Sequence, residues 1–237
     1  MPILPDLPKA EAAIIEQTNA FRAANALGAL KPDPQLARAA RVYAQYLAGT
    51  TIFSHEADGR RPADRIQLAG YKPCSSAENL ARLGHSNGFE TVQLATMNVE
   101  GWQNSPGHRR NMLMAGATET GVAIVKSRVA PAAEERKLET YIAVQLLARP
   151  EALKFEFRVE NDTGRTVSYA LGAEKKQIEP RYRVTHTLCD AAELAIETQP
   201  GGFLSKGVSA RYEARNGQVF KLKAGKGGAV EVEVTPP

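Results

Sequence analysis

The chain has 237 residues, of which 43% are hydrophobic and 24% are charged, a composition typical of one large or two ordinary globular domains. Its 30 basic and 26 acidic residues give a formal net charge of +4, and no run of Lys or Arg exceeds two residues. This balance argues against a nucleic acid or an anionic membrane surface as the main partner.

The sequence shows no membrane-spanning or secretion segment. No stretch approaches the roughly 20 apolar residues of a transmembrane helix, and residues 1–5 lack the charged start and apolar run of a signal peptide. We therefore expect a soluble chain. Two cysteines, Cys74 and Cys189, exclude a disulfide-built scaffold. We expect two reduced thiols, with one bridge as the alternative.

The first half of the chain reads mainly as helices. Apolar residues recur at helical spacing over residues 9–27, 34–48 and 89–102, with a short helix at 61–69. Between them, residues 52–59 and 71–76 read as loops, and residues 77–83 as an extended segment. Strands are predicted at residues 120–125 and 141–147, joined by a charged, alanine-rich hairpin loop at 130–137. Helices followed by a sheet favour an α+β layered fold over a doubly wound parallel sheet.

The pattern changes near residues 149–153, where we place a boundary between domains at 1–150 and 151–237. Beyond it, apolar and polar residues alternate in short runs separated by turns, with no convincing helix. The predicted strands lie at residues 155–159, 167–171, 182–188, 193–197, 208–214, 218–222 and 229–234. Such a series predicts a small all-β sandwich.

A further helix is predicted to begin at Ser105, a good N-cap residue, with Pro106 at the first helical position. His108 then lies in the first turn, where the helix dipole disfavours imidazolium and keeps the ring neutral. A neutral imidazole binds metal or accepts a proton. The alternative is a capping turn whose histidine faces solvent.

Three residues from separate segments form a candidate metal site. His55, Glu78 and His108 offer two imidazoles and one carboxylate, a set that suits a divalent cation, zinc above all. Intervals of 23 and 30 residues make no local motif, so their convergence is a hypothesis. The other two histidines are predicted to have structural or surface positions. We expect His85 in a solvent-facing loop, with the rim of the cleft as an alternative, and His186 within a strand.

Several short motifs resemble, in order and spacing, the CAP superfamily, also called the SCP domain family, in its bacterial form. The resemblance covers about residues 9–148. The motifs are Thr18-Asn19-Ala20-Phe21-Arg22, Phe53-Ser54-His55, Ala77-Glu78-Asn79-Leu80-Ala81, the run from Trp102 to Leu113, and Glu119-Thr120-Gly121-Val122. The segment after residue 153 resembles no family that we can name.

The resemblance implies a three-layer α-β-α sandwich with a central antiparallel sheet and a cleft where two histidines and two acidic residues meet. The histidines correspond to His55 and His108, and the first acidic residue to Glu78. The position of the second acidic residue holds Ser105, so the set of four is incomplete. Ser105, Asn79 and His85 are candidates to line the cleft. The family also implies a secreted or periplasmic protein.

Three functions are compatible with these features. The first is a non-catalytic binding protein whose His/Glu cleft holds a divalent metal and a lipid, glycan or cell-wall ligand. The second is a metal-assisted hydrolase acting on peptides or esters, with His55, Glu78 and His108 as candidate catalytic residues, or with Ser105 or Ser54 as a weaker nucleophile. The third is an adhesive or structural protein that makes its contact through the β domain. Family membership alone does not choose among them.

Overall fold

The computed structural model describes residues 1–130, 138–199 and 207–236. The chain divides into two compact units, Met1–Ala152 and Leu153–Pro237. The predicted loop at 130–137 lies outside the described residues except for Ala130.

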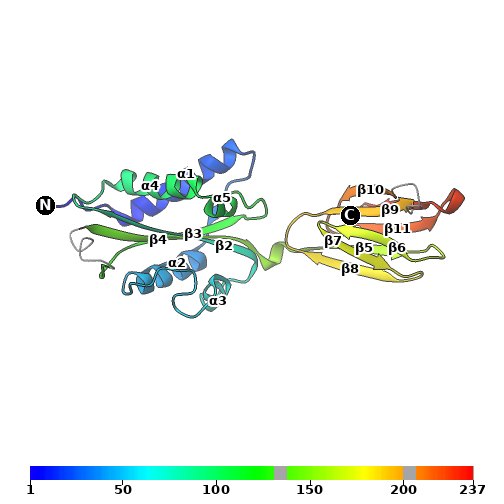
Figure 1. Cartoon of the computed structure of the whole chain (residues 1–237), viewed down its shortest axis with the longest axis horizontal. Coiled ribbons are helices and arrows are strands. Elements are labelled where there is room, and N and C mark those ends of the chain that lie inside the picture. The colour runs from blue at the N-terminus through cyan, green and yellow to red at the C-terminus, as the bar shows by residue number, and fades with distance from the viewer. Residues whose placement is uncertain (131–137, 200–206, 237) are drawn as a thin grey trace. The chain divides into compact units, whose positions relative to one another are not determined.

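The first unit is a three-layer α-β-α sandwich, as predicted (Figure 1). Helices α1, α4 and α5 cover one face of a central sheet, and α2 and α3 cover the other. The helices are α1 (Leu7–Ala24), α2 (Pro34–Leu47), α3 (Pro62–Leu68), α4 (Thr91–Asn104) and α5 (Pro106–Met112). The strands are β1 (Lys31–Pro32), β2 (Pro73–His85), β3 (Glu119–Lys126) and β4 (Glu139–Pro150).

The sheet has the order β1-β3-β4-β2 and is antiparallel except for the short β1–β3 pair. Strand β2 is longer than expected, because residues 73–76 and His85, assigned to loops from the sequence, belong to it. Its long ladder with β4, from the Pro73–Pro150 pair to the His85–Glu139 pair, explains this extension. Glu78 lies opposite Leu146, in the middle of this ladder.

Two apolar clusters hold the layers together. One joins α2 and α3 to the sheet around Leu36 and Tyr43, and the other joins α1, α4 and α5 around Trp102 and Phe89. Trp102 is a core residue, as expected, and its Nε1 donates to the carbonyl of Leu80 at 3.0 Å.

Gly121 marks the closest approach between α2 and the sheet. A Cβ atom at this position would lie 2.2 Å from the amide nitrogen of Ala37 and 2.2 Å from the carbonyl carbon of Leu36. Only glycine therefore lets α2 pack this closely against β3.

The second unit consists of two four-stranded sheets around one core, which agrees with the predicted all-β class. The sheet orders are β10-β9-β6-β7 and β12-β11-β5-β8. The strands are β5 (Phe155–Asn161), β6 (Val167–Leu171), β7 (Glu174–Ile178), β8 (Arg183–Leu188), β9 (Glu193–Gln199), β10 (Val208–Glu213), β11 (Val219–Ala224) and β12 (Val230–Thr235). Short 3-10 helices lie at Glu151–Leu153 and Lys226–Gly228.

Two features differ from the sequence-based expectations. Strand β7 was not predicted, because its Glu-Lys-Lys-Gln-Ile sequence is that of a polar edge strand with one buried side chain, Ile178. The expectation of two reduced thiols is wrong, since Cys74 and Cys189 are both disulfide-bonded and the described residues include no free cysteine. Among the described helices, none has the length and apolar character needed to cross a bilayer.

Candidate functional site

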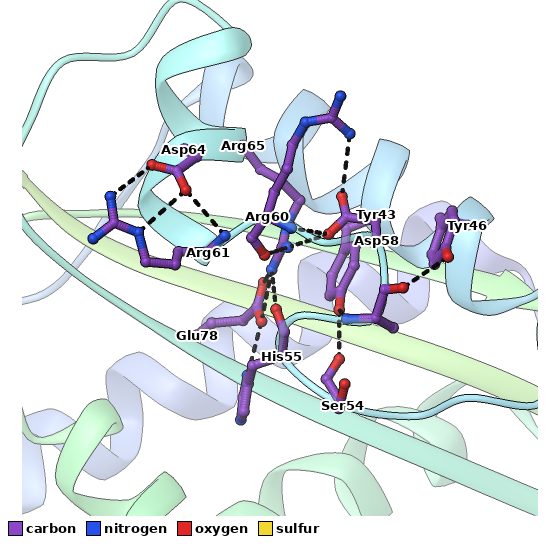
Figure 2. Close-up of polar contacts among 11 residues, drawn as sticks. Tyr43, Tyr46, Ser54, His55, Asp58, Arg60, Arg61, Asp64, Arg65 and Glu78 are labelled. Atoms are coloured by element: carbon purple, nitrogen blue, oxygen red, sulfur yellow. Dashed lines mark hydrogen bonds and ion pairs between the residues drawn. The ribbon is translucent and has the colours of Figure 1, made fainter.

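His55 lies in the loop between α2 and α3, and two tyrosines of α2 fix the backbone of this loop. The Tyr43 hydroxyl donates to the carbonyl of Ser54 and accepts from the amide of Ala57 at 3.2 Å. The Tyr46 hydroxyl donates to the carbonyl of Ala57 at 2.8 Å. These tyrosines belong to one helix, so α2 sets the path of the chain on both sides of His55 (Figure 2).

Glu78 orients the ring of His55. Its Oε1 lies 2.8 Å from Nδ1 of His55, and its side chain is only 1% exposed. Because an ionised carboxylate only accepts hydrogen bonds, Nδ1 carries the proton and Nε2 keeps the lone pair in the neutral ring. Figure 2 shows the far end of the ring pointing away from Glu78. His55 therefore offers an oriented, basic nitrogen on a side chain that is 49% exposed.

Arg65 of α3 neutralises the buried carboxylate and connects the parts of the site. Its Nη2 donates to both oxygens of Glu78, at 3.1 and 2.8 Å, and to the carbonyl of His55 at 2.9 Å. Its Nη1 donates to Asp58 Oδ1 at 2.9 Å and to the carbonyl of Arg60 at 2.7 Å. The guanidinium also lies over the ring of Tyr43, 3.4 Å from its centroid. One buried cation thus holds the backbone of His55 and its carboxylate partner together.

His108 lies in α5, where its side chain is half-buried. Burial lowers the pKa of His108 below its usual value, and the positive charge of protonated His55 lowers it further. The ring is therefore neutral at pH 7, as predicted. Desolvation is the larger of the two causes of this shift, and the predicted contribution of the helix dipole stays a prediction.

A row of side-chain amides, of which Asn79 and Gln145 are fully buried, holds α5 against the sheet. Asn111 Nδ2 donates to the carbonyl of Glu78 at 3.0 Å and to Asn79 Oδ1 at 2.9 Å. Asn79 Nδ2 donates to Gln145 Oε1 at 3.0 Å and, at 3.4 Å, to the carbonyl of His108. The α5 helix is thereby fixed to the strand that carries Glu78, which positions His108 relative to His55.

A cavity of about 380 Å³ opens beside the His55–Glu78 pair. It is lined by His55, Arg61, Pro62, Ala63, Ser76, Ala77, Glu78 and Asn111. The first residues of α3 form one wall and strand β2 another, so the cleft lies where these two elements meet. Hydrogen-bonding and charged side chains therefore line this cleft.

The remaining candidates have different positions. Asn79 is fully buried within the amide row. Ser105 is the residue between α4 and α5, but its hydroxyl makes no capping hydrogen bond, which corrects its expected role as a side-chain cap. His85 ends β2, where its Nδ1 accepts from the amide of Asn87 at 3.2 Å. Neither His85 nor Ser105 lines the cavity beside His55, and their role in a cleft stays a prediction.

Sequence reasoning missed Arg65, Asp58 and Tyr43. An arginine that follows an aspartate in a short helix has the pattern of a solvated surface residue. The available signal was the Asp58-Gly59 pair, three and four residues after His55, followed by Arg65 in the next helix.

The donor set fits a metal only in part. Both oxygens of Glu78 are already occupied, by Arg65 and His55, so Glu78 is placed to orient His55 rather than to bind a cation directly. His55 and His108 are of a residue type that binds divalent cations, and of the two only His55 lines the cavity beside Glu78. Within the described ranges, no cluster of three His, Cys, Asp or Glu side chains has the geometry of a metal site.

Comparisons with known proteins agree with this fold. The family model described as "CAP: Cysteine-rich secretory protein family" matches residues 15–145, more than half of the chain. The chain is 31% identical over 118 residues to the "Uncharacterized protein YkwD" of Bacillus subtilis (strain 168), a match covering 49% of this chain and 43% of that protein. The match therefore spans less than half of the relative's length.

Two solved structures are also similar. An outer surface protein from Borrelia burgdorferi has a TM-score of 0.48 and 19% identity, covering 60% of this chain and 93% of that one. An extracellular protein containing an SCP domain from Bacillus anthracis str. Ames has a TM-score of 0.47 and 25% identity, covering 63% of this chain and 45% of that one. The α-β-α unit with its histidine cleft is a CAP domain of the bacterial type. The chain belongs to the CAP family.

Proposed function

We propose that the first unit is a ligand-binding module in which the cleft beside His55 and Glu78 receives a lipid, glycan or cell-wall ligand together with a divalent cation. One observation carries this proposal: a buried carboxylate orients His55 and leaves Nε2 available at the edge of a cavity of about 380 Å³. This arrangement matches the way proteins support metal-binding imidazoles.

His55 and His108 would hold the cation, which we propose to be zinc, and Glu78 would fix the tautomer of His55. A bound zinc ion supplies Lewis acidity to whatever oxygen or nitrogen atom the ligand presents. Arg65 Nη2 pairs with Glu78 Oε2 at 2.8 Å, so Glu78 would support His55 without being a ligand itself. With only two protein ligands, the site leaves several coordination positions open, which favours a role in ligand capture.

We also propose that the protein works outside the cytoplasm, in a secreted or periplasmic location. Disulfide bonds persist in oxidising compartments, and both cysteines of this chain are disulfide-bonded. The similar Bacillus anthracis protein is described as extracellular.

Zinc titration by calorimetry tests the binding site. We expect one zinc ion per chain with a dissociation constant below about 1 mM, and losses of at least about tenfold for His55→Ala, His108→Ala and Glu78→Gln. His85→Ala removes an exposed histidine away from the cavity and serves as the matched control. An affinity weaker than millimolar, or an equal loss in the control, would rule out the proposed metal site.

A hydrolase is the alternative, and one observation favours it. The carboxylate–histidine hydrogen bond is also the arrangement that activates a nucleophile, and Ser76 lines the same cavity as His55. Hydrolysis of a peptide or ester substrate that a chelator abolished would support the metal-assisted form. Labelling of Ser76 by a fluorophosphonate, absent in Ser76→Ala, would instead support a serine hydrolase.

An adhesive role for the second unit is the remaining candidate. The outer face of its β10-β9-β6-β7 sheet has a hollow of about 680 Å³, lined in part by the small side chains Ser168, Ala170, Ala195 and Ser209. An Ala195→Leu change would place a larger side chain in the floor of this hollow. Unchanged attachment to cells or envelope material after this change would count against the role.

A further inference from the structure

A second cavity in the first unit lies between α2 and the end of α3, on the Arg65 side of the network. Its volume is about 210 Å³. It shares no lining residue with the cleft beside His55, since the first residues of α3 line that cleft and the last residues line this cavity. An inference about it therefore stands apart from the function proposed above.

The walls of this cavity are aliphatic. Val42 of α2 is 60% exposed and Leu68 of α3 is 74% exposed, while Ala39 is a buried wall residue. Two large aliphatic side chains thus remain in water on either side of a hollow. Covering them with a matching apolar group would remove that surface from solvent.

The rest of the lining is charged, with three arginines, Arg38, Arg60 and Arg65, and one aspartate, Asp58. Arg38 and Arg60 are exposed residues that line the cavity, and Arg38 forms no ion pair with any described residue. Asp58 also lines it, but its Oδ1 accepts from Arg65 Nη1 and from the amide of Arg60, so this carboxylate is already satisfied. Figure 2 shows the Arg60 guanidinium paired with Asp58, with Arg60 Nη1 3.7 Å from Asp58 Oδ2, so the unpaired cation of this lining is Arg38. The aliphatic walls therefore adjoin donors that an anion would satisfy.

Size restricts the occupant. A cavity of about 210 Å³ admits a branched aliphatic group but not the acyl chain of a membrane lipid. We propose that this cavity binds a small, branched aliphatic carboxylate, whose alkyl group contacts Val42 and Leu68 and whose carboxylate pairs with Arg38. This binding site is additional to the His55 cleft.

Methyl NMR of the full chain with labelled valine and leucine tests the proposal, with N-acetyl-L-leucine as the probe. As N-acetyl-L-leucine is added, we expect the Val42 and Leu68 methyl signals to shift until the site is saturated, with a dissociation constant of the order of millimolar. N-acetyl-L-leucinamide lacks the charge and N-acetylglycine lacks the alkyl group. Each is expected to bind at least about tenfold more weakly.

Two variants locate the contacts. Arg38→Gln should lower the affinity for N-acetyl-L-leucine about tenfold and leave the affinity for the amide unchanged. Val42→Gln should weaken both probes. Val92→Gln on α4 is the matched control, because Val92 is 64% exposed but lies in a different helix and does not line the cavity.

Four results would overturn the proposal. The first is equal affinity for the acid and its amide, which would indicate a neutral apolar occupant. The second is a Val92 shift as large as that of Val42, which would indicate unspecific binding. The third is a Val42 shift that follows protein concentration without probe, which would indicate a second copy of the chain. The fourth is about tenfold tighter binding of a peptide ending in leucine, which would indicate a peptide terminus.

Discussion

At the scale of single residues, Arg65 explains how a carboxylate remains buried in this site. Its guanidinium is 5% exposed and pairs with Glu78, at 1% exposure, and with Asp58, at 10%. Burying these charges is costly unless each is paired and hydrogen-bonded, and the geometry satisfies both conditions. The cation is therefore part of the site rather than of the surface.

Replacing Arg65 with methionine should leave the buried carboxylate of Glu78 without its cation, while Asp58 keeps Arg60 as a partner. We expect Arg65→Met to lower the free energy of unfolding by about 3–5 kcal/mol, measured by urea denaturation. Arg61→Met is the control, because Arg61 forms an exposed pair with Asp64 at 3.0 Å and should cost no more than about 1 kcal/mol. Similar losses in the two variants would contradict the buried role of Arg65.

At the scale of elements, the amphipathic helices were predictable because each has one apolar face toward a single core. Strand β2 was harder to recognise, since both of its faces are covered and Glu78 and Asn79 interrupt its apolar residues. The convergence of His55 and Glu78 followed from the family motifs and not from spacing. The partner of Glu78 could not be predicted, because only the folded chain brings α3 beside β2.

Gly121 gives a prediction at the same scale. An Ala side chain there would overlap the backbone of α2, and neither backbone atom can move without moving the helix. We expect Gly121→Ala to destabilise the first unit by about 1–3 kcal/mol, measured by the loss of Trp102 fluorescence in urea.

The matched change is Gly101→Ala, because Gly101 lies inside α4 and a Cβ atom added there would have no neighbouring atom within 4 Å. Alanine favours a helix interior, so this control should be neutral or stabilising by up to about 1 kcal/mol. Equal destabilisation by both changes would show that the contact between α2 and β3 is looser than described.

At the scale of the whole chain, the two units have separate cores, and the unfolding of each can be followed by a different spectroscopic signal. Trp102 is the only tryptophan in the sequence and belongs to the first unit, so its fluorescence follows that unit. In the second unit, His186 of β8 packs against Phe157, with ring centroids 5.1 Å apart, and its Nε2 lies 2.9 Å from the Tyr169 hydroxyl. This contact joins the two sheets of the unit through a titratable group.

Burial lowers the pKa of His186 below 6.5, the positive charge of Lys176 lowers it further, and Glu174 opposes this in part. The unfolded chain therefore binds a proton more readily than the folded unit does. The contribution of neutral His186 to the free energy of unfolding is complete above about pH 6.5 and is lost as the pH falls through the folded pKa. We expect urea unfolding of the second unit, followed by the NMR signals of its methyl groups, to occur at lower urea near pH 5 than near pH 7.5. His186→Gln should flatten this pH dependence, and the Trp102 transition should respond equally in both proteins. A pH dependence that persists in His186→Gln would assign it to other groups.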